Sequence, residues 1–88
     1  MSVNKTYSKD DFVNFIKLGM TTEIEEKFGE PDLMLGSGFI IVGYYLNDNT
    51  IIELNFGTGK NGLQSARIIG NNADIFNRDV IEEIELTN

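Results

Sequence analysis

The longest apolar stretch, the eight residues from Phe39 to Leu46, is the feature that most constrains this chain. The run is rich in β-branched and aromatic residues, which favour strands. It is too short to cross a bilayer, since a membrane-spanning helix needs about 20 apolar residues. A turn follows at residues 47–49, and Thr50 to Phe56 then alternates apolar and polar side chains. The sequence therefore predicts a β-hairpin at the centre of the fold.

Two further strands are expected beside this hairpin. Residues 33–35 are apolar and precede a glycine-rich turn at 36–38, and residues 63–69 follow a glycine-rich loop at 57–62. Together the four segments predict a four-stranded antiparallel meander sheet over residues 33–69.

A short helix is predicted to begin at Ser8. The Ser8 hydroxyl and the Asp11 carboxylate have the spacing of a capping box, which satisfies free N–H groups at a helix start. Phe12 and Ile16 then fall one helical turn apart on one face. Gly19 is placed to end the helix. Residues 1–7 are expected to be a disordered tail.

A second short helix is predicted to follow directly, capped by Thr21 or Thr22 and ended by Gly29 and Pro31. The two helices form a hairpin over residues 8–29. The outline resembles a helix-turn-helix, but the second helix carries three glutamates that DNA phosphates would repel.

The last segment, residues 71–88, fits two structures. Val80, Ile81 and Ile84 share one face of a helix over 77–86, while a fifth strand over 80–86 competes because glutamates crowd the helix end, which prefers cations. The helix is the favoured prediction. The fold class is thus α+β, one domain over residues 1–88, with an N-terminal αα hairpin packed on the four-stranded sheet.

The composition excludes much chemistry. The chain has no His and no Cys, so imidazole and thiolate metal sites, His-based nucleophiles and disulfides are absent. Its formal net charge is −7, concentrated in residues 21–32 and 70–88, which disfavours nucleic acid and anionic membranes as partners. No targeting segment stands out, so we expect a cytoplasmic location if the chain is complete, and an envelope or secreted one if a leader was removed.

The sequence offers little for catalysis or cofactor binding. Residues 57–62 match G-x-G-x-x-G, but a strand rather than a helix follows, so a hairpin loop is expected. Glu53 has no second carboxylate predicted opposite it, as acid/base chemistry would need. We therefore expect no enzyme activity, no cofactor and no metal.

The register of the hairpins predicts a binding surface. With two-residue turns, Tyr45 lies opposite Ile52 and Met34 opposite Ile41. The short helices cover one sheet face and leave the other as an apolar surface, which monomers rarely expose. The C-terminal segment, a second copy or a different protein could cover it. The predicted partner-binding residues are Ile40, Val42, Tyr44, Leu46, Ile51 and Glu53.

Parts of residues 15–68 also resemble a known family. The segments concerned are Gly19-Met20-Thr21, Glu23-Ile24, Phe28-Gly29-Glu30-Pro31-Asp32, Tyr44-x-Leu46-x-Asp48, the strand ending at Phe56, and Ala66-x-Ile68. They are similar to the β-lactamase-inhibitory-protein-like superfamily, which includes the SmpA/OmlA-like small lipoproteins. The resemblance implies a helix hairpin on a curved antiparallel sheet whose open face binds a protein.

The functional expectation is a non-catalytic protein-interaction module that binds a protein partner or itself through an apolar sheet face. One alternative is an acidic immunity- or inhibitor-type protein that neutralises a basic partner through residues 21–32 and 70–88. The other is a structural domain without a ligand.

Overall fold

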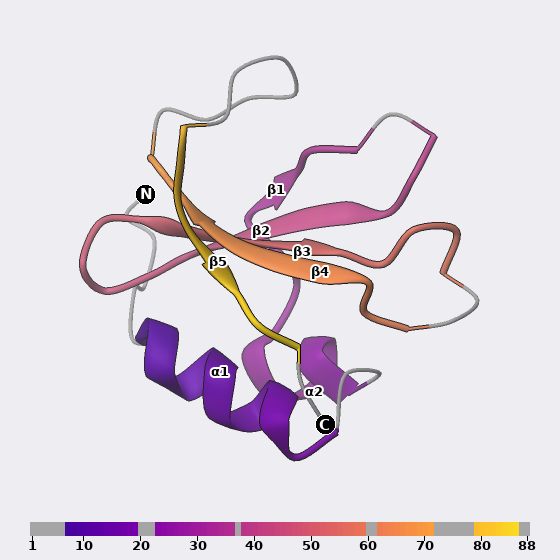
Figure 1. Ribbon diagram of the computed structural model, residues 1–88, viewed down its shortest axis with the longest axis horizontal. Helices are drawn as coiled ribbons and strands as arrows, with labels where there is room; N and C mark the ends of the chain where they lie inside the picture. The colour runs from indigo at the N-terminus through magenta and orange to yellow at the C-terminus, as the bar shows by residue number, and fades with distance from the viewer. Residues whose placement is uncertain (1–6, 20–22, 37, 60–61, 72–78, 87–88) are drawn as a thin grey trace.

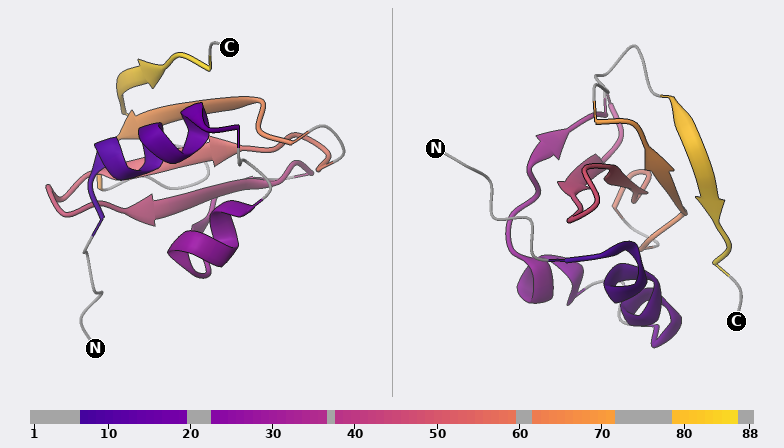
Figure 2. Two further views of the ribbon diagram at one scale, coloured as in Figure 1. Left: turned by 90° about the horizontal axis from the view of Figure 1, so that it is seen from below. Right: turned by 90° about the vertical axis from the view of Figure 1, so that its left-hand side faces the viewer.

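The structure, a computed structural model, describes residues 7–19, 23–36, 38–59, 62–71 and 79–86. Within these ranges the strands form one antiparallel sheet in the order β1-β2-β3-β4-β5 (Figure 1). Both helices lie on the same face of this sheet (Figure 2). The predicted α+β class is confirmed, with a fifth strand added to the predicted four. The elements are α1 (Lys9–Lys17), α2 (Ile24–Phe28), β1 (Leu33–Met34), β2 (Ile41–Tyr45), β3 (Ile51–Asn55), β4 (Ser65–Ile69) and β5 (Val80–Ile84).

Helix α1 begins where the sequence predicts. The Ser8 hydroxyl accepts a hydrogen bond from the backbone N–H of Asp11 at 3.3 Å, and the Asp11 carboxylate accepts one from the Ser8 N–H at 2.9 Å. This capping box satisfies two donors at the helix start. Phe12 and Ile16 are the buried residues of the helix. Gly19, in the left-handed region with a φ of 79°, ends the turn.

Helix α2 is shorter and contributes Ile24 as its buried residue. The backbone N–H of Gly29 donates to the Glu25 carbonyl oxygen at 2.8 Å, and Gly29 then leaves the helix with a φ of 87°. Pro31 prevents continuation, as predicted. The predicted caps, Thr21 and Thr22, lie outside the described residues.

The predicted register of the central hairpin is wrong by one residue. Tyr44 lies opposite Ile52. A two-residue turn would have placed Tyr45 in this position. The loop has three residues, 47–49, because the Leu46 N–H donates to the Thr50 carbonyl oxygen at 2.8 Å. Asn49 takes a φ of 71°, the left-handed conformation that closes a three-residue hairpin loop. A one-residue slip turns β2 over relative to β3.

The first hairpin is also offset by one residue. Met34 lies opposite Val42 rather than opposite Ile41. The side chains of β1 and β3 therefore point to the sheet faces predicted for them, and those of β2 alone point to the opposite faces. The helix-side residues of β2 are Val42 and Tyr44, while Ile41 and Tyr45, predicted to face the helices, lie on the opposite side.

Residues 80–84 form strand β5, so the helix favoured over residues 77–86 is wrong in its described part. Strand β5 pairs antiparallel with β4, with Ile84 opposite Ala66, and its register shifts by one residue beside Ile68 and Ile69. The strand lets Ile84 pack against the main core while its glutamates stay exposed. A helix would have set the same glutamates at its negative end.

Two apolar clusters lie on the two faces of the sheet. The larger one fills the space between the helices and the sheet, and it contains a stack in which the rings of Phe12 and Phe28 have centroids 3.8 Å apart. Tyr7, expected in the tail, contacts both rings. The buried members of this cluster are Phe12, Ile16, Ile24, Val42, Tyr44, Leu46, Ile52, Leu54, Ala66 and Ile68. The smaller cluster, on the other face, buries Leu35, Ile51 and Ile69.

Candidate functional site

The six predicted partner-binding residues do not share one face. Val42, Tyr44 and Leu46 are buried in the cluster beneath the helices. Ile51 is buried on the opposite face, and β2 and β3 bring Glu53 to that same side. The reason is the register, because β2 is turned over relative to the expectation. The uniform apolar surface predicted from these residues is therefore absent.

The face opposite the helices carries a charged pair among its apolar residues. Glu53 is only 3% exposed, and its Oε1 lies 3.3 Å from Nε of Arg67, the residue directly opposite it on β4. Around this pair, Leu33, Ile41 and Tyr45 are partly buried against the smaller cluster. This face thus combines a small apolar cluster with an ion pair.

An apolar groove lies where α2 meets the beginning of β2. Its volume is about 320 Å³, at the lower end of the range of about 300–1,000 Å³ that is usual for ligand pockets. Three of the predicted residues, Ile40, Val42 and Tyr44, line it. The full lining among the described residues is Ile24, Glu25, Pro31, Ile40, Val42, Tyr44, Phe56, Gly59 and Gly62.

The chain builds the mouth of the groove from a backbone pairing between the residue before β2 and the residues after β3. The Ile40 N–H donates to the Gly57 carbonyl oxygen at 2.7 Å, and the Phe56 N–H donates to the Ile40 carbonyl oxygen at 2.7 Å. A Cβ at Gly59 would lie 2.9 Å from Cδ1 of Ile40, so the loop can approach this side chain closely because Gly59 has none. Ile40 is held in place yet remains 44% exposed.

Tyr44 forms the inner wall of the groove. Its hydroxyl donates a hydrogen bond of 2.7 Å to the carbonyl oxygen of Gly29, which links β2 to the end of α2. Burial, with a smaller contribution from the negative charges of Glu25 and Asp32, raises the pKa of Tyr44 to about 12. Both carboxylates are thus close enough to affect the Tyr44 hydroxyl, and Glu25 lies in the wall of the groove.

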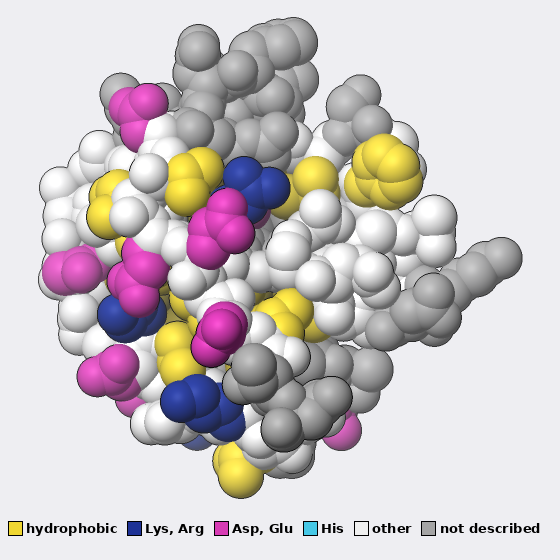
Figure 3. All heavy atoms as spheres, viewed as in Figure 1, with side chains coloured by type: hydrophobic (Ala, Val, Ile, Leu, Met, Phe, Trp, Pro, Cys, Tyr) yellow, Lys and Arg dark blue, Asp and Glu magenta, His cyan; other side chains and the backbone are white. Residues whose placement is uncertain are grey.

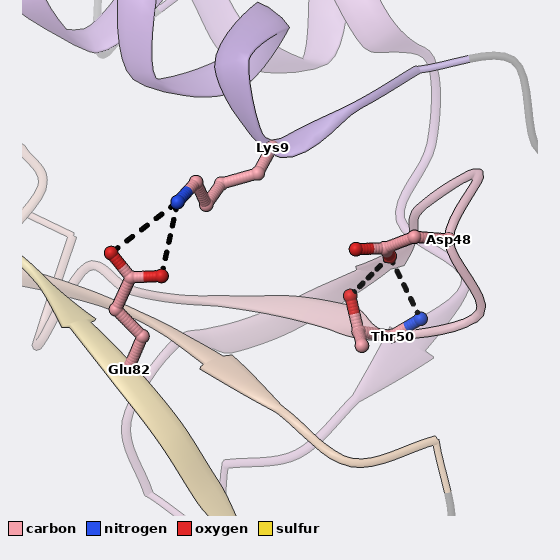
Figure 4. A network of polar contacts seen from close by, with 4 residues as sticks. All are labelled: Lys9, Asp48, Thr50 and Glu82. Carbon is pink, nitrogen blue, oxygen red and sulfur yellow. Dashed lines mark hydrogen bonds and ion pairs between the residues drawn. The ribbon is translucent and has the colours of Figure 1, made fainter.

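A second hollow, between α1 and β5, is polar. It has a volume of about 530 Å³, and Lys9, Lys17 and the glutamates of β5 are among the residues that line it. Figure 4 shows Lys9 reaching across it to both carboxylate oxygens of Glu82, at 3.0 and 3.3 Å. This contact raises the pKa of Lys9. The charges of this hollow therefore compensate one another in part.

Asp48 has a structural part in the central hairpin. Its Oδ1 accepts hydrogen bonds from the hydroxyl and the backbone N–H of Thr50, at 2.6 and 3.1 Å (Figure 4). The hydroxyl bond is the main reason that the pKa of Asp48 is lowered. Among the described residues, no group of three or more His, Cys, Asp or Glu side chains is arranged to hold a metal ion.

The distribution of apolar side chains on the surface also favours the groove as the candidate site. On the side viewed in Figure 3, hydrophobic side chains are scattered among acidic and basic ones rather than joined in one broad area. The groove, by contrast, gathers apolar side chains from α2, the following loop, β2 and the loop after β3. Sequence reasoning missed Ile24, Pro31, Phe56 and Gly59 as neighbours, since their contact depends on the pairing of Ile40 with Gly57. The sequence signal was the pair of large apolar residues, Phe39 and Ile40, directly after the glycine-rich turn.

Comparisons with protein-family models, with curated proteins and with solved structures find no match to this chain. The family resemblance therefore rests on the residues quoted for it. In the described part of the chain, no helix has the length and apolar character needed to span a membrane.

Proposed function

We propose that this chain is a non-catalytic binding module that holds a protein partner, or a second copy of itself, in the groove between α2 and β2. The observation that carries the proposal is an open apolar groove with a partly exposed isoleucine at its mouth. Phe39, the neighbour of Ile40, is 58% exposed. Exposed large apolar residues beside a concave site are typical of the anchor points of protein interfaces.

The alternative of an enzyme finds less support. Hydrolysis with two carboxylates needs a pair on either side of the substrate, whereas the described lining of the groove contains one carboxylate, that of Glu25. Non-catalytic binding needs only the shape and apolar character that the groove has.

The acidic alternative is favoured by one observation, because Glu25 belongs to the acidic segment 21–32 and also lies in the groove wall. The two hypotheses differ in their response to salt. Apolar docking is nearly independent of ionic strength, while binding through exposed charges weakens as salt rises.

Site-specific crosslinking tests the proposed surface. A photoreactive amino acid at position 40, compared with the same group at the exposed Leu18, which caps the C-terminal end of α1 and does not line the groove, should capture a protein from native lysate at position 40 alone. The captured protein is then purified and titrated against wild type, Ile40→Asp and Leu18→Asp.

We expect Ile40→Asp to weaken this binding about 10-fold or more. The partner would bury the exposed part of the isoleucine, and complete burial of such a side chain contributes about 1.5–3 kcal/mol. Leu18→Asp should have no effect. If the captured species is the chain itself, sedimentation should show a dimer that Ile40→Asp dissociates. Equal capture at both positions, or unchanged affinity in Ile40→Asp, would contradict the proposal.

A further inference from the structure

Building on the proposed function, we infer that the occupant of the groove is a segment of a different protein that inserts an apolar side chain and sets a Lys or Arg beside Glu25. This names the chemistry of the partner: an apolar anchor flanked by positive charge. Shape and charge support it independently.

The shape of the groove fits a side chain rather than a flat surface. Its walls are Ile24, Val42, Tyr44 and Phe56, all contributing to the main apolar cluster, and its volume is about 320 Å³. An anchor entering from outside would contact Ile40 first. A small apolar site of this kind is typical of a single hot-spot residue at an interface.

The charge of the groove is negative in its described part. Glu25 lies in the described wall, whereas Asp32 lies outside it, with its Oδ2 accepting a hydrogen bond from the backbone N–H of Tyr45 at 2.9 Å. Both carboxylates raise the pKa of the Tyr44 hydroxyl inside the groove. A cation next to the apolar anchor would meet an opposite charge there.

A second copy of this chain is a poorer occupant than a basic segment. Each copy carries a net charge of −7, so two copies repel each other as they approach.

The experiment uses the full ¹⁵N-labelled chain and three synthetic peptides of equal length. The first has a central Phe flanked by lysines, the second has the same Phe flanked by glutamates, and the third keeps the lysines but replaces Phe by Ser. Amide shifts at Glu25, Ile40 and Gly59 report binding in the groove.

We expect only the Phe–Lys peptide to shift these amides strongly, and its affinity to fall only slightly as salt is raised, because salt screens the single charge pair but not the apolar anchor. Glu25→Gln should weaken it about two- to five-fold, as expected for one partly exposed charge pair. Glu83→Gln on β5 removes an equal charge away from the groove and should leave the affinity unchanged. Lys60→Gln, next to Gly59 in the sequence, should leave it unchanged or strengthen it.

The outcomes separate this inference from the proposed function. If the Phe–Glu peptide binds the groove as tightly as the Phe–Lys peptide, the groove is a docking site but the charge inference is wrong. If the groove amides shift with protein concentration alone, the occupant is a second copy and the inference is wrong. If neither Phe peptide shifts them, or if binding survives in a folded Ile40→Asp variant, both proposals fail.

Discussion

The hydroxyl of Tyr44 donates a 2.7 Å hydrogen bond to the carbonyl oxygen of Gly29, joining the middle of β2 to the residue that ends α2. This bond closes the inner side of the groove. Tyr44→Phe removes the donor while keeping the ring, so we expect the free energy of unfolding to fall by about 1 kcal/mol. Urea denaturation of both proteins measures the difference.

Tyr7→Phe is the matched control for this prediction. The Tyr7 hydroxyl lies 3.5 Å from the Lys27 carbonyl oxygen, a long and exposed contact that should contribute little. If Tyr44→Phe and Tyr7→Phe lowered the free energy of unfolding equally, the bond to Gly29 would contribute no more to stability than the Tyr7 contact.

The same hydroxyl predicts how stability responds to alkaline pH. Folding raises the pKa of Tyr44 from an ordinary value of 10.0 to about 12, so the folded state favours the neutral phenol. The resulting stabilisation is complete below about pH 10 and is lost as the pH rises towards 12, because the unfolded chain releases this proton first. Denaturation series across this pH range should therefore decline more steeply for wild type than for Tyr44→Phe, and parallel declines would contradict the prediction.

The pair formed by Glu53 and Arg67 gives a third prediction. Arg67→Met removes the cation beside a carboxylate that is 3% exposed, whereas the arginine side chain itself is 39% exposed. Removing one partner of a fully buried pair costs about 3–5 kcal/mol, and the exposure of Arg67 should reduce this to about 1–2 kcal/mol. In the Glu53→Gln background the same substitution should cost clearly less, as a double-mutant cycle would reveal. Additive effects would mean that the two side chains do not interact.

Gly36 is predicted to tolerate no side chain. A Cβ built there would overlap the backbone carbonyl oxygen of Phe39 and lie 3.0 Å from the backbone nitrogen of Ile41. Because backbone atoms cannot rotate away as a side chain can, Gly36→Ala should lower the free energy of unfolding by about 2–3 kcal/mol. Gly43→Ala meets mainly the side chains of Ile51 and Leu35, so its loss should be smaller. Thermal denaturation of the two variants gives the comparison.

The sequence predicts most of the elements because their signals are local. The capping box of Ser8 and Asp11 and the stop at Gly29 depend on residues within one turn, and both are present in the structure. Strand β5 could not be recognised with the same certainty, because its partner β4 decides it and the apolar spacing at Val80 and Ile84 also fits a helix.

The candidate site was harder to predict than the elements because it depends on register. Asn47-Asp48-Asn49 is compatible with a two- or a three-residue loop, and this choice decides whether Tyr44 lies under the helices or away from them. A local signal for the longer loop existed, since Asp48 followed two residues later by Thr50 is typical of a turn closed by the Asp side chain. The groove itself joins segments from α2 to the loop after β3, which no local pattern reveals.

Asn49 supplies a direct test of that loop. Its φ of 71° lies in the left-handed region, which an L-residue with an ordinary side chain occupies at a cost of about 1–2 kcal/mol and which Gly enters freely. Asn49→Gly should leave stability unchanged or slightly raised, while Asn49→Val should lower the free energy of unfolding by about 1–2 kcal/mol, because a branched Cβ fits this region worst. Asn47→Val, one residue outside the turn centre and without a positive φ, is the control and should cost less. If Asn49→Val were as stable as Asn49→Gly, the loop could not depend on a left-handed residue at position 49, and the register that buries Tyr44 beneath the helices would lose its local cause.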